Sequence, residues 1–188
     1  MELKSVHNLF LSELADMYDA EQQITKALPQ MIEETQDPKL KNRLQTHLEE
    51  TQQQVKNLEA CFQSLGEKAK AEKCMGIAGI IGEKQKMSGE KPSQEVLQAI
   101  DLGAGLKVEN YEIASYTSLI GMAVMMGHAE CERLLKENLQ QENDMARFLE
   151  QNAARLMDEL GSRTGEKNMA GNGRGNGGAH SMRPNAAR

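Results

Sequence analysis

Apolar residues recur along the chain at alternating steps of three and four, which is the period of an amphipathic helix. The pattern predicts a first helix over about residues 3–35 and a second over about residues 38–65. The first has Val6, Phe10, Leu14, Met17, Ile24, Leu28 and Met31 on its apolar face, and the second has Leu44, Leu48, Val55, Leu58, Phe62 and Leu65. Asp37 followed by Pro38 is typical of a helix start, and Gly66 of a helix end.

The same period returns in the second half of the chain. A third helix is expected from Pro92-Ser93 to residue 126, and a fourth from about residue 128 to residue 160, with Gly127 between them. Residues 67–92 form a connector, in which "KCMGIAGIIGEKQKM" is expected to make a short helix that packs on the bundle. The predicted fold class is therefore all-α: a four-helix bundle with a long crossover connector that carries a short extra helix.

The composition supports an all-α fold and differs between residues 1–160 and residues 161–188. Strong helix formers dominate, aromatic residues are 3%, and tryptophan is absent. Residues 161–188 are rich in Gly, Asn and Arg, and five basic residues there face one acidic residue, a net charge of +4. The total of −6 then leaves −10 on residues 1–160. We expect a bundle over residues 1–160 and a disordered tail over residues 161–188.

The charge, the cysteines and the lack of long apolar runs indicate which ligands and which cellular compartment to expect. A net negative charge argues against nucleic-acid binding by the bundle, and the basic tail has no interleaved aromatic residues for stacking on bases. No apolar run is long enough for a signal peptide or a membrane span. Cys61, Cys74 and Cys131 have no paired spacing and are expected to be buried thiols. These features favour a cytoplasmic protein that does not bind membranes.

Carboxylates occupy positions on the apolar faces of all four predicted helices. Glu21, Glu112 and Glu142 lie on the apolar stripes, and Glu50 lies at the edge of its stripe near Gln54. Counted at about 1.5 Å per residue, each glutamate is roughly 22 Å from the turn of its own hairpin. Each hairpin therefore brings its two glutamates to one level of the bundle.

Ionised carboxylates in an apolar core need compensation by protonation, by basic partners or by a metal. No lysine or arginine is expected on the inner faces at this level. Hard oxygen ligands suit iron or manganese, so a metal site is favoured, while protonated or solvated carboxyls remain the alternative. Glu109 precedes Glu112 by one turn and is an alternative ligand, but a solvated flank is the favoured interpretation. His47 is expected to bond a neighbouring helix rather than a metal.

Five stretches of the chain together resemble the YciE/YciF family of the ferritin-like superfamily. They are "YDAEQQITKAL", "HLEETQQQVKNLE", "KCMGIAGII", "VENYEIASYTSL" and "ERLLKENLQQEND". The resemblance covers most of the chain up to about residue 160. It implies a ferritin-like bundle, a homodimer and expression in bacterial stress, and such proteins are often described as ferroxidase-like.

The superfamily pattern is a Glu on one helix and Glu-x-x-His on the next, in each half. Glu21 and Glu50 match the carboxylates of the first half, and Glu112 and Glu142 those of the second. The histidines do not match, because Gln53 and Met145 stand in their places. Proteins of this family resemble one another in placing the ligand at the fourth residue, instead of the third, after the second glutamate of each half. At that position Gln54 fits as a ligand, and Ala146 does not. The resemblance thus implies metal ligands at Glu21, Glu50, Gln54, Glu112 and Glu142, with the second half one ligand short.

Three functions follow as hypotheses. The first is a stress protein that binds one or two iron ions, or manganese, and oxidises iron or consumes peroxide. The second is a non-enzymatic dimeric scaffold whose metal site has decayed. The third is a DNA-protecting protein that acts through the basic tail.

Overall fold

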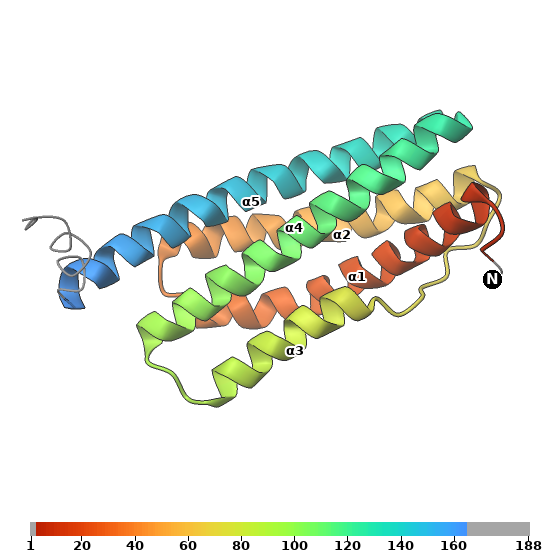
Figure 1. Ribbon diagram of the computed structural model, residues 1–188. Helices are drawn as coiled ribbons and strands as arrows, with labels where there is room; N and C mark the ends of the chain where they lie inside the picture. Colours follow the sequence, from red (N-terminus) through yellow and green to blue (C-terminus); the bar gives the residue numbers. More distant parts are fainter. Residues whose placement is uncertain (1–2, 165–188) are drawn as a thin grey trace, which may run out of the picture.

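A computed structural model describes residues 3–164, and these residues form five helices and no strand (Figure 1). The helices are α1 (Val6–Glu34), α2 (Pro38–Ser64), α3 (Met75–Gly89), α4 (Gln94–Met126) and α5 (Ala129–Thr164). The all-α prediction is confirmed, as is a short helix in the connector. The expected start of the tail at residue 161 falls inside α5, and the rest of the tail lies outside the described residues.

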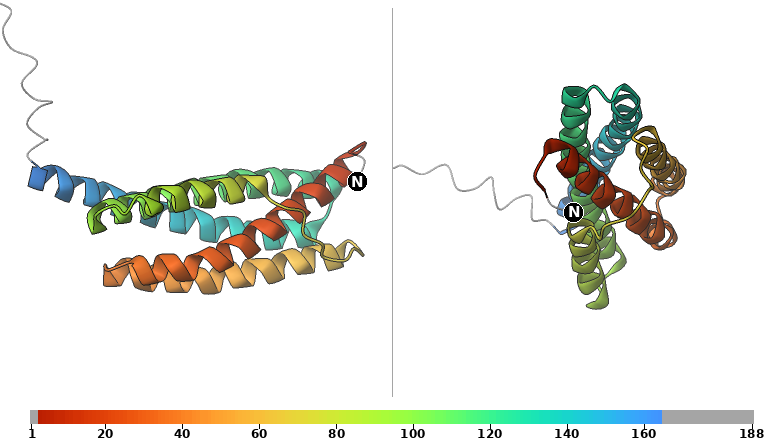
Figure 2. Two further views of the ribbon diagram at one scale, coloured as in Figure 1. Left: turned by 90° about the horizontal axis from the view of Figure 1, so that it is seen from below. Right: turned by 90° about the vertical axis from the view of Figure 1, so that its right-hand side faces the viewer.

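The four long helices pack around a common axis, and each contacts two others. α1 lies against α2 and α4, while α5 lies against α4 and α2, so α2 and α4 face each other across a diagonal (Figure 2). α2 ends at one end of the bundle and α4 begins at the other, so the connector must return along its length (Figure 1). α3 lies on α1 and α4 during this return.

Local signals in the sequence fix where the helices begin and end. Asp37 caps α2, with its side chain accepting a hydrogen bond from the Lys39 amide at 2.8 Å. Ser93 caps α4 in the same way through the Val96 amide at 3.4 Å. Gly66 and Gly127 follow α2 and α4 with φ of 75° and 73°, the left-handed conformation that glycine adopts without a steric penalty.

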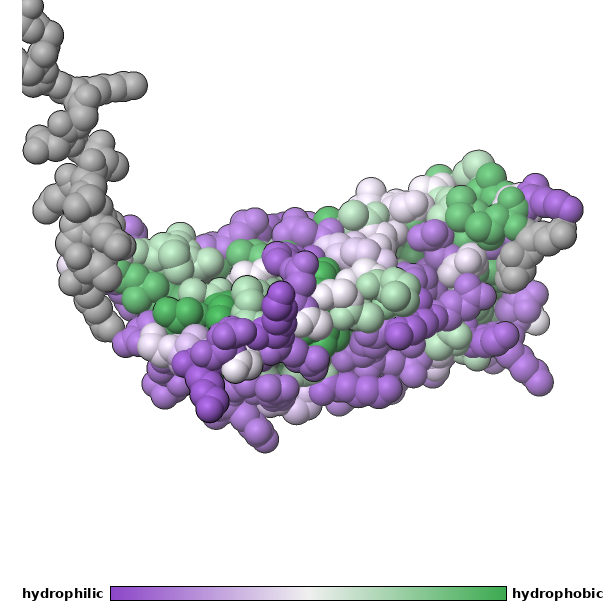
Figure 3. Space-filling model, turned by 60° about the horizontal axis from the view of Figure 1, so that its bottom comes forward, coloured by the Kyte–Doolittle hydropathy of each residue, from purple (hydrophilic) through white to green (hydrophobic). Residues whose placement is uncertain are grey.

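The apolar stripes pack into one core that runs the length of the bundle. The predicted stripe of α1 is buried from Phe10 to Leu28, whereas Val6 at the helix start is 41% exposed. All three cysteines are buried thiols, as expected. On the face over α1 and α3 the surface is mostly hydrophilic, with apolar patches towards its ends (Figure 3). None of the described helices combines the length and apolar character needed to cross a membrane.

Candidate metal centre

The apolar core is interrupted at mid-length by a cluster of polar side chains contributed by all four long helices. Each is at most 3% exposed. The members that concern us are Glu21 of α1, His47 and Gln54 of α2, Glu109, Glu112 and Tyr116 of α4, and Asn138 and Glu142 of α5. Burying this many ionisable groups is unfavourable unless they compensate one another or bind an ion.

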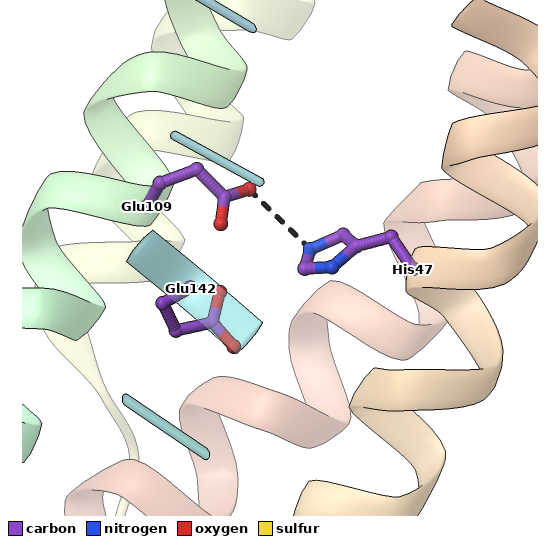
Figure 4. A group of neighbouring side chains, drawn as sticks. All are labelled: His47, Glu109 and Glu142. Atoms are coloured by element: carbon purple, nitrogen blue, oxygen red, sulfur yellow. Dashed lines mark ion pairs between the residues drawn. The ribbon is translucent and has the colours of Figure 1, made fainter. Parts of the chain in front are cut away.

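Two groups of three side chains in this cluster have their ligand atoms within 4.8 Å of one another. One group is Glu21, Glu112 and Glu142. The other is His47, Glu109 and Glu142, drawn in Figure 4. Glu142 belongs to both groups, so its carboxylate links them.

Helix periodicity explains why these residues meet. Glu109 and Glu112 are three residues apart on α4, so their side chains leave the helix on the same face, and Tyr116 follows one turn later. Glu142 lies one heptad from Leu135 and from Leu149, which are both fully buried. The polar centre is therefore built into the same stripes that form the core.

His47 connects opposite helices of the bundle. Its Nε2 lies 3.3 Å from Glu109 Oε1, so His47 forms an ion pair with α4, the diagonally opposite helix, rather than a bond to a neighbouring helix (Figure 4). Its Nδ1 lies 3.4 Å from Glu50 Oε2. Burial alone would lower the pKa of His47, but the nearby carboxylates of Glu109 and Glu50 outweigh burial and raise this pKa to about 9. The raised pKa favours the imidazolium form of His47.

The carboxyl groups are driven towards their neutral forms. Burial raises the pKa of Glu21 to about 7, although the Tyr116 hydroxyl and His47 limit the rise. Burial, reinforced by neighbouring carboxylates, also raises the pKa of Glu112 and of Glu142 well above the usual range. Glu21 is within hydrogen-bonding reach of Glu112, so a proton can be shared within this pair.

When no proton is shared, one oxygen of each carboxylate has no hydrogen-bond donor. These atoms are the Oε2 atoms of Glu21, Glu109, Glu112 and Glu142. Buried acceptors without donors are rare in folded proteins, because each retains its desolvation penalty. Four such oxygens in one cluster, together with an imidazole nitrogen, form a donor set that fits divalent metal ions.

Neutral side chains hold two of the carboxylates in place. Tyr116 donates a hydrogen bond to Glu21, and its own hydroxyl oxygen accepts one from Asn138 Nδ2 at 3.0 Å. Asn57 Nδ2 in turn donates to Asn138 Oδ1 at 2.7 Å. On the other side, the Gln54 amide donates to Glu142. The carboxylates are thereby oriented by rigid helices and by buried hydrogen bonds.

Four of the five residues expected as ligands lie in this cluster. Glu21, Glu112 and Glu142 form one of its groups, and Gln54 contacts Glu142. Glu50 belongs to neither group: its side chain is 25% exposed and pairs with Arg43 at 2.7 Å. Burial alone would raise the pKa of Glu50, but His47 and Arg43 lower it. Arg43 is a basic partner that the helical pattern did not place at this level.

Glu109 is the residue that sequence analysis misplaced. It is 3% exposed rather than on a solvated flank, and it contacts His47. Its spacing of three from Glu112 was the available signal, because residues three apart share a helix face. Tyr116, four residues after Glu112, could have been found in the same way. The structure brings Glu109 of α4 and the imidazole of His47 of α2 close to Glu142 of α5.

Comparison with known proteins places this architecture in a family. Residues 5–160 match the family described as "Domain of unknown function (DUF892)". Protein YciF of Escherichia coli (strain K12) is 36% identical over 143 residues, which cover 76% of this chain and 86% of YciF.

Two solved structures are similar to this one. The crystal structure of the E. coli stress protein YciF matches with a TM-score of 0.78 and 33% identity, covering 83% of this chain and 99% of that one. YcfI from Rhodopseudomonas palustris matches with a TM-score of 0.77 and 40% identity, covering 79% of this chain and 95% of that one. The chain therefore belongs to the DUF892 family of YciF-like proteins.

Proposed function

We propose that this protein binds two divalent metal ions, iron or manganese, in its buried carboxylate cluster. Glu21 and Glu112 would hold one ion, His47 and Glu109 the other, and Glu142 would bridge the two. The observation that carries the proposal is that Glu142 belongs to both groups, each with all ligand atoms within 4.8 Å. Two divalent cations would also balance four ionised carboxylates.

The ligand types favour this class of metal. Carboxylate oxygens are hard ligands that suit manganese and iron, and an imidazole is common at iron sites. Metal-bound histidines usually donate their second ring N–H to a carboxylate, and Glu50 lies 3.4 Å from His47 Nδ1 for that role. We therefore assign Glu50 to positioning His47, and Gln54 to positioning Glu142, rather than to direct ligation.

The activity that fits such a centre is oxidation of Fe(II) by O₂ or peroxide. Bound iron would supply the redox capacity for this reaction. The chain's own residues exclude bulk water, because every ligand is at most 3% exposed. Tyr116 holds Glu21 through its hydroxyl, and the Gln54 amide holds Glu142. Such a reaction suits a protein related to a stress protein.

A second candidate function is a scaffold that binds no metal. The raised pKa values of Glu21, Glu112 and Glu142 favour it, because protonated carboxyls can satisfy one another without an ion. The third hypothesis, DNA protection through residues 161–188, concerns a segment almost entirely outside the described residues and stays a prediction.

Anaerobic titration with Fe(II), followed by exposure to O₂, separates the first two functions. Wild-type protein should bind Fe(II) and oxidise it faster than free Fe(II) is oxidised in the same buffer. Glu142→Gln removes the residue shared by both groups and should abolish the acceleration. Glu49→Gln changes an exposed residue on α2 and is the matched control. A wild-type protein that neither binds nor oxidises Fe(II) would favour the scaffold.

A further inference from the structure

A cavity of about 320 Å³ lies beneath the connector helix α3. It is bounded by α1, α3 and α4, and its inner end reaches residues of α2 and α5. Its walls are mainly aliphatic, and include Ile24, Leu28, Ile80, Ile81 and Val108. The volume falls within the range of roughly 300–1,000 Å³ that is usual for small-molecule pockets.

The cavity reaches one residue of the polar centre. Glu109 lines the cavity and also belongs to the group with His47 and Glu142. Leu44 and Met145 line the same inner region from α2 and α5. A molecule in the cavity would therefore place its innermost atoms beside a carboxylate of the centre.

Polar side chains collect among the lining residues that are nearer to solvent. Lys26 and Gln30 of α1 and Gln85 of α3 are exposed lining residues. Lys84 also lines the cavity, but its ammonium group lies 2.6 Å from Glu34 and 3.1 Å from Asp101. Because these two carboxylates already neutralise Lys84, Lys26 is the cation best placed for a ligand at the mouth.

Small residues keep the α4 wall open. Ala104 and Gly105 both line the cavity. A Cβ added at Gly105 would lie 3.0 Å from Leu149 Cδ1, so even a methyl group there would push the end of that leucine. A large side chain at position 104 would occupy the cavity.

We propose that this cavity binds a medium-chain fatty acid, with the alkyl chain inward and the carboxylate at the mouth beside Lys26. The aliphatic walls favour transfer of the alkyl chain out of water. The lining residues at the inner end include no basic side chain that could pair with an anionic head group, whereas Lys26 is an exposed lining residue, which fixes the orientation. Binding in this direction needs no metal, so the inference does not depend on the proposed function.

Calorimetric titration of the chelator-treated full-length protein with octanoate tests the proposal. We expect saturable binding of one octanoate per chain. Ala104→Phe should weaken it by about tenfold or more, because the ring fills the cavity. Ala114→Phe, at an exposed position of the same helix, should bind octanoate like wild type. Octanoate that fails to bind wild type, or binds Ala104→Phe and Ala114→Phe equally, would overturn the proposal.

A second comparison tests the head group. Lys26→Gln should weaken binding of octanoate while leaving binding of 1-octanol unchanged. Equal weakening of both, or of neither, would contradict the assignment of Lys26.

If Ala104→Phe does not fold, Gly105→Ala takes its place, because its smaller methyl group displaces only the end of Leu149. Weaker octanoate binding by this variant supports the proposal, and wild-type binding overturns it. Manganese binding, measured separately on the same proteins, reports on the metal centre and not on the cavity.

Discussion

His47 of α2 and Glu109 of α4 meet across the diagonal of the bundle, with Nε2 and Oε1 3.3 Å apart and both side chains nearly inaccessible to solvent. In the metal-free protein His47 pairs with Glu109 on one side and with Glu50 on the other. In the metal-bound protein His47 and Glu109 would turn to the ion. The stability of the two forms should therefore respond differently to pH and to substitution.

The metal-free protein should lose stability as pH rises from about 5 to 9. The pKa of Glu21 is raised to about 7 and that of His47 to about 9, so both groups are stabilising in their protonated forms. Their contributions are fully present below the unfolded-state pKa values and are lost as pH rises through the folded-state values. Glu112 and Glu142 act with the same sign.

Melting temperatures measured in chelator across this range test the pH prediction. The loss should amount to a few kcal/mol in the free energy of unfolding. Saturating Mn(II) should flatten the dependence, because bound metal favours the ionised carboxylates. A metal-free protein that becomes more stable towards pH 9 would show that the cluster is not protonated in this way.

Replacing His47 should be strongly destabilising in the metal-free protein. His47→Ala leaves Glu109 buried without its cation, and breaking a buried ion pair from one side typically costs about 3–5 kcal/mol. Urea unfolding of the chelator-treated variant measures the loss. His7→Ala, at an exposed position near the start of α1, should change stability by less than about 0.5 kcal/mol. Similar losses for both histidines would argue against a buried charge at Glu109.

Tyr116 and Tyr18 form a matched pair for testing the buried hydrogen bonds. Tyr116→Phe removes the donor to Glu21 and the acceptor of Asn138, both buried, and should cost about 1–3 kcal/mol in the free energy of unfolding. Tyr18→Phe removes a hydrogen bond to the exposed Glu59 and should cost less than about 0.5 kcal/mol. Urea unfolding compares them. Equal costs would contradict the role assigned to Tyr116.

The helices, their caps and much of the centre could be predicted from local signals. Asp37, Ser93 and Gly127 act on neighbouring backbone, and Glu21 and Glu142 lie squarely between core residues of their own helices, so periodicity alone places them. Glu50 lies at the edge of the apolar stripe of its helix, where a rotation of about 100° per residue does not decide whether a side chain points inward or outward. The ion pair with Arg43 keeps Glu50 partly exposed. The orientation of such an edge residue depends on the side chains around it, and the apolar pattern of one helix does not include them.

The pairing of His47 with Glu109 in the second group could not be predicted from periodicity within one helix. His47 and Glu109 come from helices that share no short turn, and the pair forms only because α2 and α4 lie diagonally opposite. The cavity beneath α3 likewise depends on how the connector packs on α1 and α4, which periodicity within the connector does not determine.

Equilibrium binding of Mn(II) to the wild-type protein and to Glu142→Gln, each first stripped with chelator, tests the central claim most directly. A centre with a carboxylate shared by two groups predicts two bound ions per wild-type chain. Glu142→Gln should bind at most one ion and bind it more weakly, while its helical content stays unchanged. The claim is contradicted if wild type binds no Mn(II), or if Glu142→Gln binds as many ions with the same affinity.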